Sequence, residues 1–310
     1  MIINCNPDDD ILKMITDPMQ GTFDDNAEII YHYTSPEGVI GILEKDDVKL
    51  HFTKYTGMND TTEGIVIYEK FRSICDKLEQ EKYIDFNLKE KLIGLIDTIS
   101  PRNQLRIKKE IDGEEKEFSL DDLYICCFSV ENDALPMWNY YTKNGEHQGY
   151  ALGFKSLRVL SRKKDSTVAV NLLCYRVDYY EEKLENYVRA YISSIRNNPD
   201  MDIMNHGFDL IKRYLILGSI MHKSSCFKHE NEIRMVLLAG EEDKQELKFK
   251  TKNGILIPYL ELFFDKSSLK KITIGPLIEK DLASNNLVEF LQHKGYQDIE
   301  IQHSKVPIRY

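Results

Sequence analysis

The sequence lacks the signatures of several common classes of protein. It has six cysteines, but there is no CxxC pair and no regular spacing among them, which argues against a zinc knuckle and a disulfide framework. It has no phosphate loop, GxGxxG, HExxH or GxSxG, so the usual nucleotide-binding, metalloprotease and serine-hydrolase motifs are missing. It also has no apolar run of membrane-spanning length and no basic flank followed by an apolar stretch at its start. These absences predict a cytoplasmic protein with reduced thiols and no membrane partner.

Basic residues are also fewer than acidic residues. The chain of 310 residues has 41 Lys and Arg against 51 Asp and Glu, a formal net charge of -10. Such a chain repels a phosphate backbone, so broad nucleic-acid binding is disfavoured. The hydrophobic share of 42% is enough to bury a full core without disulfides or metals.

The periodicity of apolar residues predicts an α+β fold. We expect strands over 28–33, 48–53, 123–130, 149–154, 168–179, 232–238, 255–264, 271–274 and near 299. We expect helices over 35–44, 62–100, 136–142, 181–197, 204–221 and 279–293. Strands dominate both ends and helices the middle, which is not a regular βαβ alternation. The organisation expected is a loose segment over 1–27 and a single α+β domain over 28–310, with helical insertions near 62–100 and 181–221.

Two candidate groups lie near the start of the chain. The first is a strand-to-helix junction made of Tyr31, His32, Tyr33 and Thr34. Its polar side chains either face a ligand or pack inside the protein as part of an ordinary strand. The turn around Asn59 is followed by Asp60 and Glu63, and Asn or Asp in such a turn is more often a cap.

A third group follows the strongly apolar strand over 123–130, which ends near Ser129. Trp138, Tyr140 and Tyr141 come after it, and such aromatic residues either form a wall for a planar ring or cover the core.

The fourth group is Glu230, Glu232 and Arg234, at the entry of another apolar strand. A period of two puts all three side chains on one face, with Arg234 paired to a carboxylate. Charges at the mouth of a buried strand are costly unless paired, so the group is either a functional site or an ion-pair ladder on an exposed edge.

Several pieces of the chain together resemble a bacterial family of uncharacterised proteins, domain-of-unknown-function family 2971. They are YHYTSPEGVIGIL, MNDTTEG, CFS, MWNYY, GYALGF, ENEIR, KKITIGP and HSKVPIRY, in family order from about residue 31 to residue 310. Each piece alone is weak, and the combination is specific.

The order of these motifs is in turn similar to ADP-ribosyltransferases of the histidine-tyrosine-glutamate type. This resemblance implies a split, mostly antiparallel sheet with helical insertions and an enzyme that cleaves NAD at the nicotinamide bond and transfers ADP-ribose to an unknown acceptor. It implies that His32 contacts the NAD ribose, that the backbone at Tyr33 meets the carboxamide, and that Tyr141, or less readily Tyr140, stacks on nicotinamide. Glu232 would be the catalytic carboxylate and Glu230 the first acid of a Glu-x-Glu pair.

The remaining residues assigned to NAD binding through the resemblance are Thr34, Trp138, Ser129, Asn59 and Arg234. No metal is expected. We further expect the strands of His32 and Glu232 to be neighbours facing one cleft, and we expect Glu232→Gln to preserve folding while suppressing nicotinamide release.

Two other functions stay open at the level of the sequence. One is a non-enzymatic nucleotide-binding or interaction module of a bacterial defence or stress system. A toxin or defence role would also fit the transferase. The other is a metal-dependent nuclease or hydrolase that uses Asn59, Asp60, Glu63 and Glu230.

Overall fold

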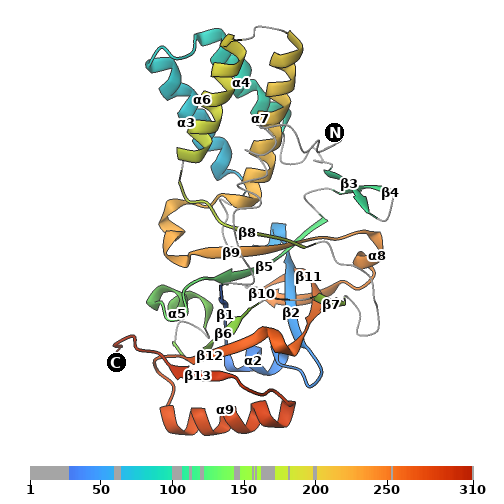
Figure 1. Cartoon of the computed structure of the whole chain (residues 1–310), viewed down its shortest axis with the longest axis vertical. Coiled ribbons are helices and arrows are strands. Elements are labelled where there is room, and N and C mark those ends of the chain that lie inside the picture. The colour runs from blue at the N-terminus through green and yellow to red at the C-terminus, as the bar shows by residue number, and fades with distance from the viewer. Residues whose placement is uncertain are drawn as a thin grey trace. The chain divides into compact units, whose positions relative to one another are not determined.

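The structure is a computed structural model, and it describes residues 28–58, 64–99, 107–111, 114–118, 122–142, 147–155, 157, 159–161, 172–180, 182–197, 201–252 and 254–308. The chain divides into two compact units. The first, here called the helical unit, comprises Met1–Gly21, Met58–Asp121 and Val177–Lys228; the second, the sheet unit, comprises Thr22–Gly57, Asp122–Arg176 and His229–Tyr310. Each unit is described by itself below (Figure 1).

The sheet unit is built on one mixed sheet in the strand order β10-β11-β2-β5-β1-β6-β12-β13, with β9 on β5, β8 on β9 and β7 on β11. The strands are β1 (Ile30–Thr34), β2 (Val48–Lys54), β5 (Leu123–Ser129), β6 (Tyr150–Phe154), β7 (Val159–Ser161), β8 (Leu172–Arg176), β9 (Glu232–Leu238), β10 (Lys248–Lys252), β11 (Ile255–Phe264), β12 (Leu269–Ile274) and β13 (Glu300–His303). The pairings are antiparallel except for β12 with β13, which run parallel. The mostly antiparallel sheet expected from the sequence is therefore confirmed.

Strand β5 is where the sheet divides. One edge of β5 pairs along its whole length with β9. The other edge pairs first with β2, through Ile125 and Tyr124, and then with β1, through Ser129. Strands β1 and β2 therefore leave β5 in different directions, and the edge of β5 between Ile125 and Ser129 opens between them.

The large core of the sheet unit lies on one face of the sheet, and a smaller buried cluster gathers around Tyr33 and Trp138. Alternate residues of β5 and β9, such as Phe128 and Ile233, point into this face together with Phe52 and Phe264. Helix α2 (Pro36–Ile42) covers part of it and begins with Ser35, whose Oγ accepts from the backbone N–H of Gly38. Helix α9 (Lys280–Lys294) also packs on this core and runs along β12 and β13 (Figure 1).

The short helical elements of the sheet unit are η1 (Tyr55–Gly57), α5 (Leu135–Tyr141), α8 (Glu241–Lys244) and η5 (Lys266–Ser268). The turn η4 (Ser225–Glu230) links the two units along the chain and ends in the sheet unit.

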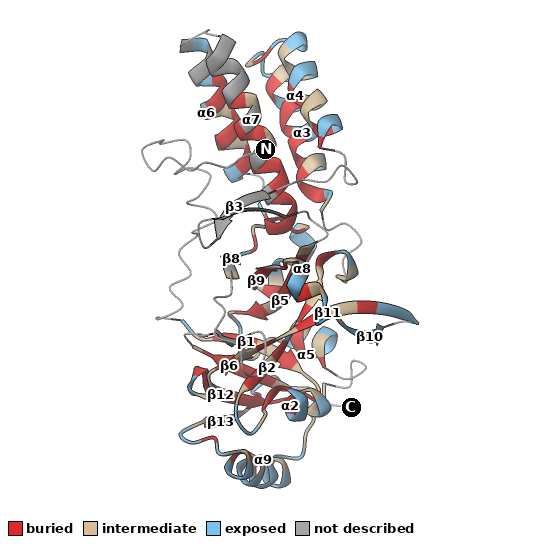
Figure 2. Cartoon of the chain, turned by 90° about the vertical axis from the view of Figure 1, so that its right-hand side faces the viewer, coloured by how far each residue is buried: buried red, intermediate tan, exposed pale blue. Residues whose placement is uncertain are grey.

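The helical unit contains α3 (Val66–Gln80), α4 (Phe86–Thr98), α6 (Glu182–Asn197) and α7 (Met201–Met221), with the small hairpin of β3 (Ile107–Ile111) and β4 (Glu114–Phe118). The four helices share a core of their own around Phe71, Leu92, Val188 and Leu215. Figure 2 shows the buried residues on the helix faces that turn toward one another.

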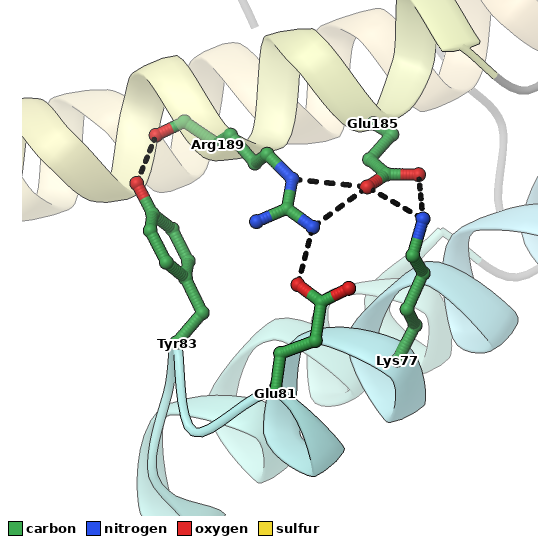
Figure 3. A network of polar contacts seen from close by, with 5 residues as sticks. All are labelled: Lys77, Glu81, Tyr83, Glu185 and Arg189. Carbon is green, nitrogen blue, oxygen red and sulfur yellow. Dashed lines mark hydrogen bonds and ion pairs between the residues drawn. The ribbon is translucent and has the colours of Figure 1, made fainter.

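An ion-pair network joins α3 to α6 on the surface of the helical unit (Figure 3). Glu185 accepts from the Lys77 Nζ at 2.8 and 2.9 Å and from the Arg189 Nε at 2.9 Å. Arg189 also donates to Glu81 at 2.5 Å, and its guanidinium lies 5.0 Å from the ring centre of Tyr83. Since exposed pairs contribute only about 0.2–1 kcal/mol each, the buried core stabilises this helix pair far more than the network does.

Most elements lie where the sequence predicts them, but one expected helix is broken and the short elements β3, β4, β7, β10 and α8 were not predicted. The helix expected over 62–100 is broken into α3 and α4, because the chain turns at Lys82, which has a φ of 57°, and restarts at Asp85, whose side chain caps α4. Strand β10 was missed: its alternating lysines and short length are typical of an edge strand and give little apolar signal.

Candidate functional site

Three distant segments of the chain meet at the carboxyl end of β5. Ser129 pairs with Tyr31 of β1 on one side and with Glu232 of β9 on the other. One step back along the sheet, Cys127 pairs with Arg234, and Arg234 pairs with Tyr175 of β8. Directly opposed residues of antiparallel strands share a face, so Ser129, Glu232 and Arg234 face away from the Phe128 core.

Glu232 and Arg234 form a buried ion pair on this face. Arg234 Nε donates to Glu232 Oε1 at 2.8 Å, and Nη2 donates to Oε2 at 3.2 Å. Glu232 is 3% exposed and Arg234 0% exposed. The two-point contact fixes the carboxylate in position, since the planar guanidinium holds both oxygens at once. The expected pairing of Arg234 with a carboxylate is confirmed, and burial of the pair excludes the exposed-edge ladder.

Glu230 lies beside the pair, although it does not belong to the strand as the period-two pattern predicts. Strand β9 begins at Glu232, and Asn231 has a φ of 42°, in the left-handed region that breaks the alternation. The buried Glu230 accepts a hydrogen bond from Tyr141 Oη at 2.8 Å, and its backbone carbonyl accepts from Ser129 Oγ at 2.6 Å. Burial raises the pKa of Tyr141, and the charges of Glu230 and Glu232 raise it further, so the phenol stays protonated as a donor.

His32 lies in the opening between β1 and β2. Its Nδ1 is 2.9 Å from the backbone carbonyl of Cys127. A carbonyl only accepts, so Nδ1 carries the proton. Burial lowers the pKa of His32, and Lys250 lowers it further against the opposing effect of the Cys127 carbonyl. The ring is therefore neutral at pH 7, with Nε2 as a hydrogen-bond acceptor.

The expectation that β1 and β9 are neighbouring strands is wrong. Both pair with β5, on its opposite edges. Strand alternation also puts His32 with Ile30 on the core side, in ring contact with Phe128, whereas Glu232 is on the other side. The opening in the sheet nevertheless leaves His32 within electrostatic reach of Lys250, whose amino group donates to Thr53 Oγ1 at 2.8 Å. Thr53 pairs with Ile125, so it belongs to the Glu232 face.

The aromatic residues of the predicted site have different environments. Tyr33 is buried; its hydroxyl donates to the Glu131 carbonyl at 2.8 Å and accepts from Ala134 N–H at 3.2 Å. Trp138 is 0% exposed and donates through Nε1 to Asp133 at 2.8 Å, so it supports the Tyr33 ring at 4.8 Å from inside the protein.

Tyr140, by contrast, is 62% exposed. Its ring is therefore open to contact from solution in a way that the buried Trp138 ring is not.

Thr34 and Asn59 complete the predicted set. Thr34 is half-buried above Gly38, where a Cβ would overlap its Oγ1, so the strand and α2 approach closely only because residue 38 is glycine. Asn59 lies outside the described residues, as do Asp60 and Glu63.

Sequence reasoning overlooked two residues that shape this site. Tyr175 is buried against the ion pair, and burial raises its pKa while Arg234 lowers it. Asp133 accepts from Trp138, from Ser304 Oγ at 2.5 Å and from the Lys305 backbone N–H at 2.7 Å, which ties α5 to the end of the chain. Neither residue could be recognised from the sequence, because a tyrosine in a strand and an aspartate before a helical turn are both common.

Two further properties concern the described residues as a whole. Among them, no three His, Cys, Asp or Glu side chains gather in a way that would hold a metal ion. None of the helices in that part of the chain is both long and apolar enough to cross a bilayer.

Comparison with known proteins matches one family. Residues 137–235, from α5 to the middle of β9, match the family described as Protein of unknown function (DUF2971). The resemblance to this family expected from the sequence is confirmed over these residues. The DUF2971 segment is about a third of the chain, and it includes Tyr140, Tyr141, Glu230, Glu232 and Arg234. Searches of the curated proteins and of the solved structures gave no match.

Proposed function

We propose that the sheet unit binds NAD, cleaves its nicotinamide bond and transfers the ADP-ribose group to an acceptor. The observation that carries this proposal is the convergence of three segments at the end of β5. Glu232 is fixed by Arg234, Glu230 accepts from Tyr141, and both acids adjoin the strand that pairs with Tyr31. The three segments lie about 90 to 200 positions apart in the chain, so only the fold brings them together.

The charge of this group suits the reaction. Two carboxylates, Glu230 and Glu232, lie in a buried environment with one guanidinium, Arg234. When the bond between the ribose C1′ and the pyridinium nitrogen breaks, its electron pair goes to the ring and positive charge develops on the ribose. A preorganised negative group lowers the energy of that transition state because it needs no reorganisation.

His32 lies on the core side of the sheet, opposite Glu232, so this proposal gives it no contact with the ribose. Its ring is instead fixed by the hydrogen bond from Nδ1 to the Cys127 carbonyl.

The test measures NAD affinity by calorimetry and nicotinamide release by chromatography on the parent protein and on Glu230→Gln and Glu232→Gln. Each substitution removes a charge and keeps the size of the side chain, so we expect release to fall about a hundredfold to a thousandfold with NAD affinity little changed. Glu289→Gln, at an exposed position of α9, is the matched control and should release nicotinamide at the parental rate.

The two remaining outcomes separate the alternatives. A parent that binds no NAD contradicts the proposal. Binding of NAD without release of nicotinamide favours a binding-only module, for which the enclosure of Glu232 by Arg234 is the supporting observation.

A further inference from the structure

The hairpin of β10 and β11 forms one end of the sheet and presents apolar side chains to solvent. Three large apolar side chains on it are exposed, Phe249 at 60%, Ile255 at 64% and Leu256 at 67%. Among the described residues, none of the other strands has an exposed side chain of this kind. Figure 2 shows the exposed end of the hairpin in pale blue. Exposed apolar side chains that gather in one place mark an interaction surface.

Backbone pairing leaves one edge of this hairpin open. Strand β2 pairs with β11 only from Tyr259 to Phe264, so the part of β11 over 255–258 pairs with β10 alone among the described strands. None of these strands pairs with the outer edge of β10. A two-stranded ribbon has marginal stability by itself, and an open edge offers a row of N–H and C=O groups to a third strand.

The two faces of β10 differ in chemistry, because side chains alternate along a strand. One face has Lys248 and Lys250, and Lys252 follows them at the same spacing in the chain. The other face has Phe249, and the register with β11 adds Leu256 to it. A strand that pairs with the outer edge of β10 therefore meets cations on one face and apolar side chains on the other.

The lysine face is suited to carboxylates. Lys248 Nζ donates to Glu261 Oε2 at 2.6 Å, and the Lys248 side chain is still half-exposed. Lys250 Nζ donates to Thr53 Oγ1, a neutral group, at 2.8 Å. Directly opposed residues of neighbouring strands lie close together, and opposite charges in such positions stabilise the pairing of the strands. Acidic side chains on an added strand are therefore favoured on this face.

The same arrangement disfavours two other occupants of the edge. A second copy that paired through its own β10 would bring lysines against lysines, and like charges in opposed positions are destabilising. A lipid surface requires cations and apolar side chains that point the same way, whereas Lys250 and Phe249 are on opposite faces.

We propose that β10 binds an extended segment of a partner protein, in which acidic and apolar residues alternate, as an additional strand of the sheet. The acidic residues face Lys248 and Lys250, the apolar residues contact Phe249 and Leu256, and the backbone pairs with the open edge of β10. This surface is independent of the proposed function, because β11 and β2 separate β10 from β5 in the sheet.

The experiment uses the full-length protein and a short synthetic peptide in which glutamate alternates with valine. Fluorescence anisotropy of the labelled peptide measures binding, and hydrogen exchange follows the backbone amides of β10. We expect the peptide to bind and to increase protection in β10, because its strand covers the open edge. Phe249→Ser and Leu256→Ser should each weaken binding at least about tenfold. Ile40→Ser, at a position of α2 that is also 60% exposed, is the matched control and should bind like the parent.

A second peptide, with lysine in place of glutamate, tests the charge of the partner. The parent should prefer the glutamate peptide at least about tenfold. Lys248→Gln combined with Lys250→Gln removes both charges, so this preference should fall to about twofold or less. Lys270→Gln, at an exposed position of β12, should keep the preference of the parent.

Several results overturn this inference. A parent that does not bind the glutamate peptide, or that binds it without added protection in β10, has no strand-addition site there. Equal binding of the two peptides by the parent contradicts an acidic partner. If the parent binds vesicles of anionic lipid and Phe249→Ser does not, the hairpin is a membrane contact instead. Dimerisation of the parent in sedimentation velocity that is lost in Phe249→Ser assigns the edge to a second copy.

Discussion

Arg234 is a fully buried guanidinium, and its charge is balanced by Glu232 through two hydrogen bonds. Removing one partner of such a pair leaves the other charge buried and uncompensated, which typically costs about 3–5 kcal/mol. We therefore expect Glu232→Gln to lower the free energy of unfolding by about that amount, measured by urea denaturation followed by circular dichroism. The expectation from the sequence that this variant still folds stays a prediction.

A double variant separates this stability effect from chemistry. Glu232→Gln combined with Arg234→Met removes both charges, so most of the lost stability should return, since apolar replacement of a buried pair is often neutral. Nicotinamide release should stay low, because the carboxylate is still missing. If Glu232→Gln is as stable as the parent, the ion pair does not have the energetic role that its burial indicates.

At the scale of elements, the helical unit has a polar contact between the residues that lead into α6 and the residues that follow α7. Asp178, after β8, forms a parallel bridge with His222, after α7, and its Oδ2 is 3.6 Å from His222 Nε2. Burial lowers the pKa of His222 to about 4; Asp178 opposes this, while Lys70 and Lys183 add to it. The ring is thus neutral in the folded protein at neutral pH.

The pKa of His222 predicts how stability depends on pH. Unfolded histidine has a pKa of about 6.5, so between pH 6.5 and 4 the unfolded state binds more protons than the folded state. The free energy of unfolding of the helical unit should therefore fall as the pH falls through this window, by about 3 kcal/mol, and not change further on this account below pH 4.

The measurement is chemical denaturation at several pH values, with α7 followed by hydrogen exchange. His222→Gln has no charge to gain, so it should lose about 3 kcal/mol less than the parent between pH 6.5 and 4. His293→Gln, exposed on α9, should follow the parent. Identical pH dependence in the parent and His222→Gln would show that His222 is not kept neutral by its surroundings.

At the scale of the whole molecule, the two large hydrophobic cores among the described residues lie in different units. One core lies entirely within the sheet unit and includes Leu50; the other lies entirely within the helical unit and includes Leu92. Each insertion that makes up the helical unit also starts and ends next to paired strands, since β2 pairs with β5 and β8 pairs with β9. The sheet is therefore complete without the inserted helices.

Separate cores predict separate unfolding. We expect Leu50→Ala and Leu92→Ala each to destabilise one unit by about 2–5 kcal/mol, because both side chains are at most 1% exposed. Native-state hydrogen exchange should show lost protection in β2 and β5 for Leu50→Ala and in α3 and α7 for Leu92→Ala. Equal loss of protection in both units for either variant would mean that the protein unfolds as one cooperative unit.

The sequence by itself determined most of the local structure and the resemblance to the DUF2971 family over residues 137–235. Ser35 before Pro36 predicted the start of α2, and the apolar run over 123–130 predicted the buried strand β5. Both signals are patterns of residues that are adjacent in the chain. Only the tertiary structure decided what the polar residues do. The Glu232–Arg234 pair is read from an i, i+2 spacing, but its burial depends on β5 and β8, which lie more than 50 positions away. The separation of β1 from β9 depends likewise on which distant strands pair, and the packing of the whole sheet unit decides that pairing.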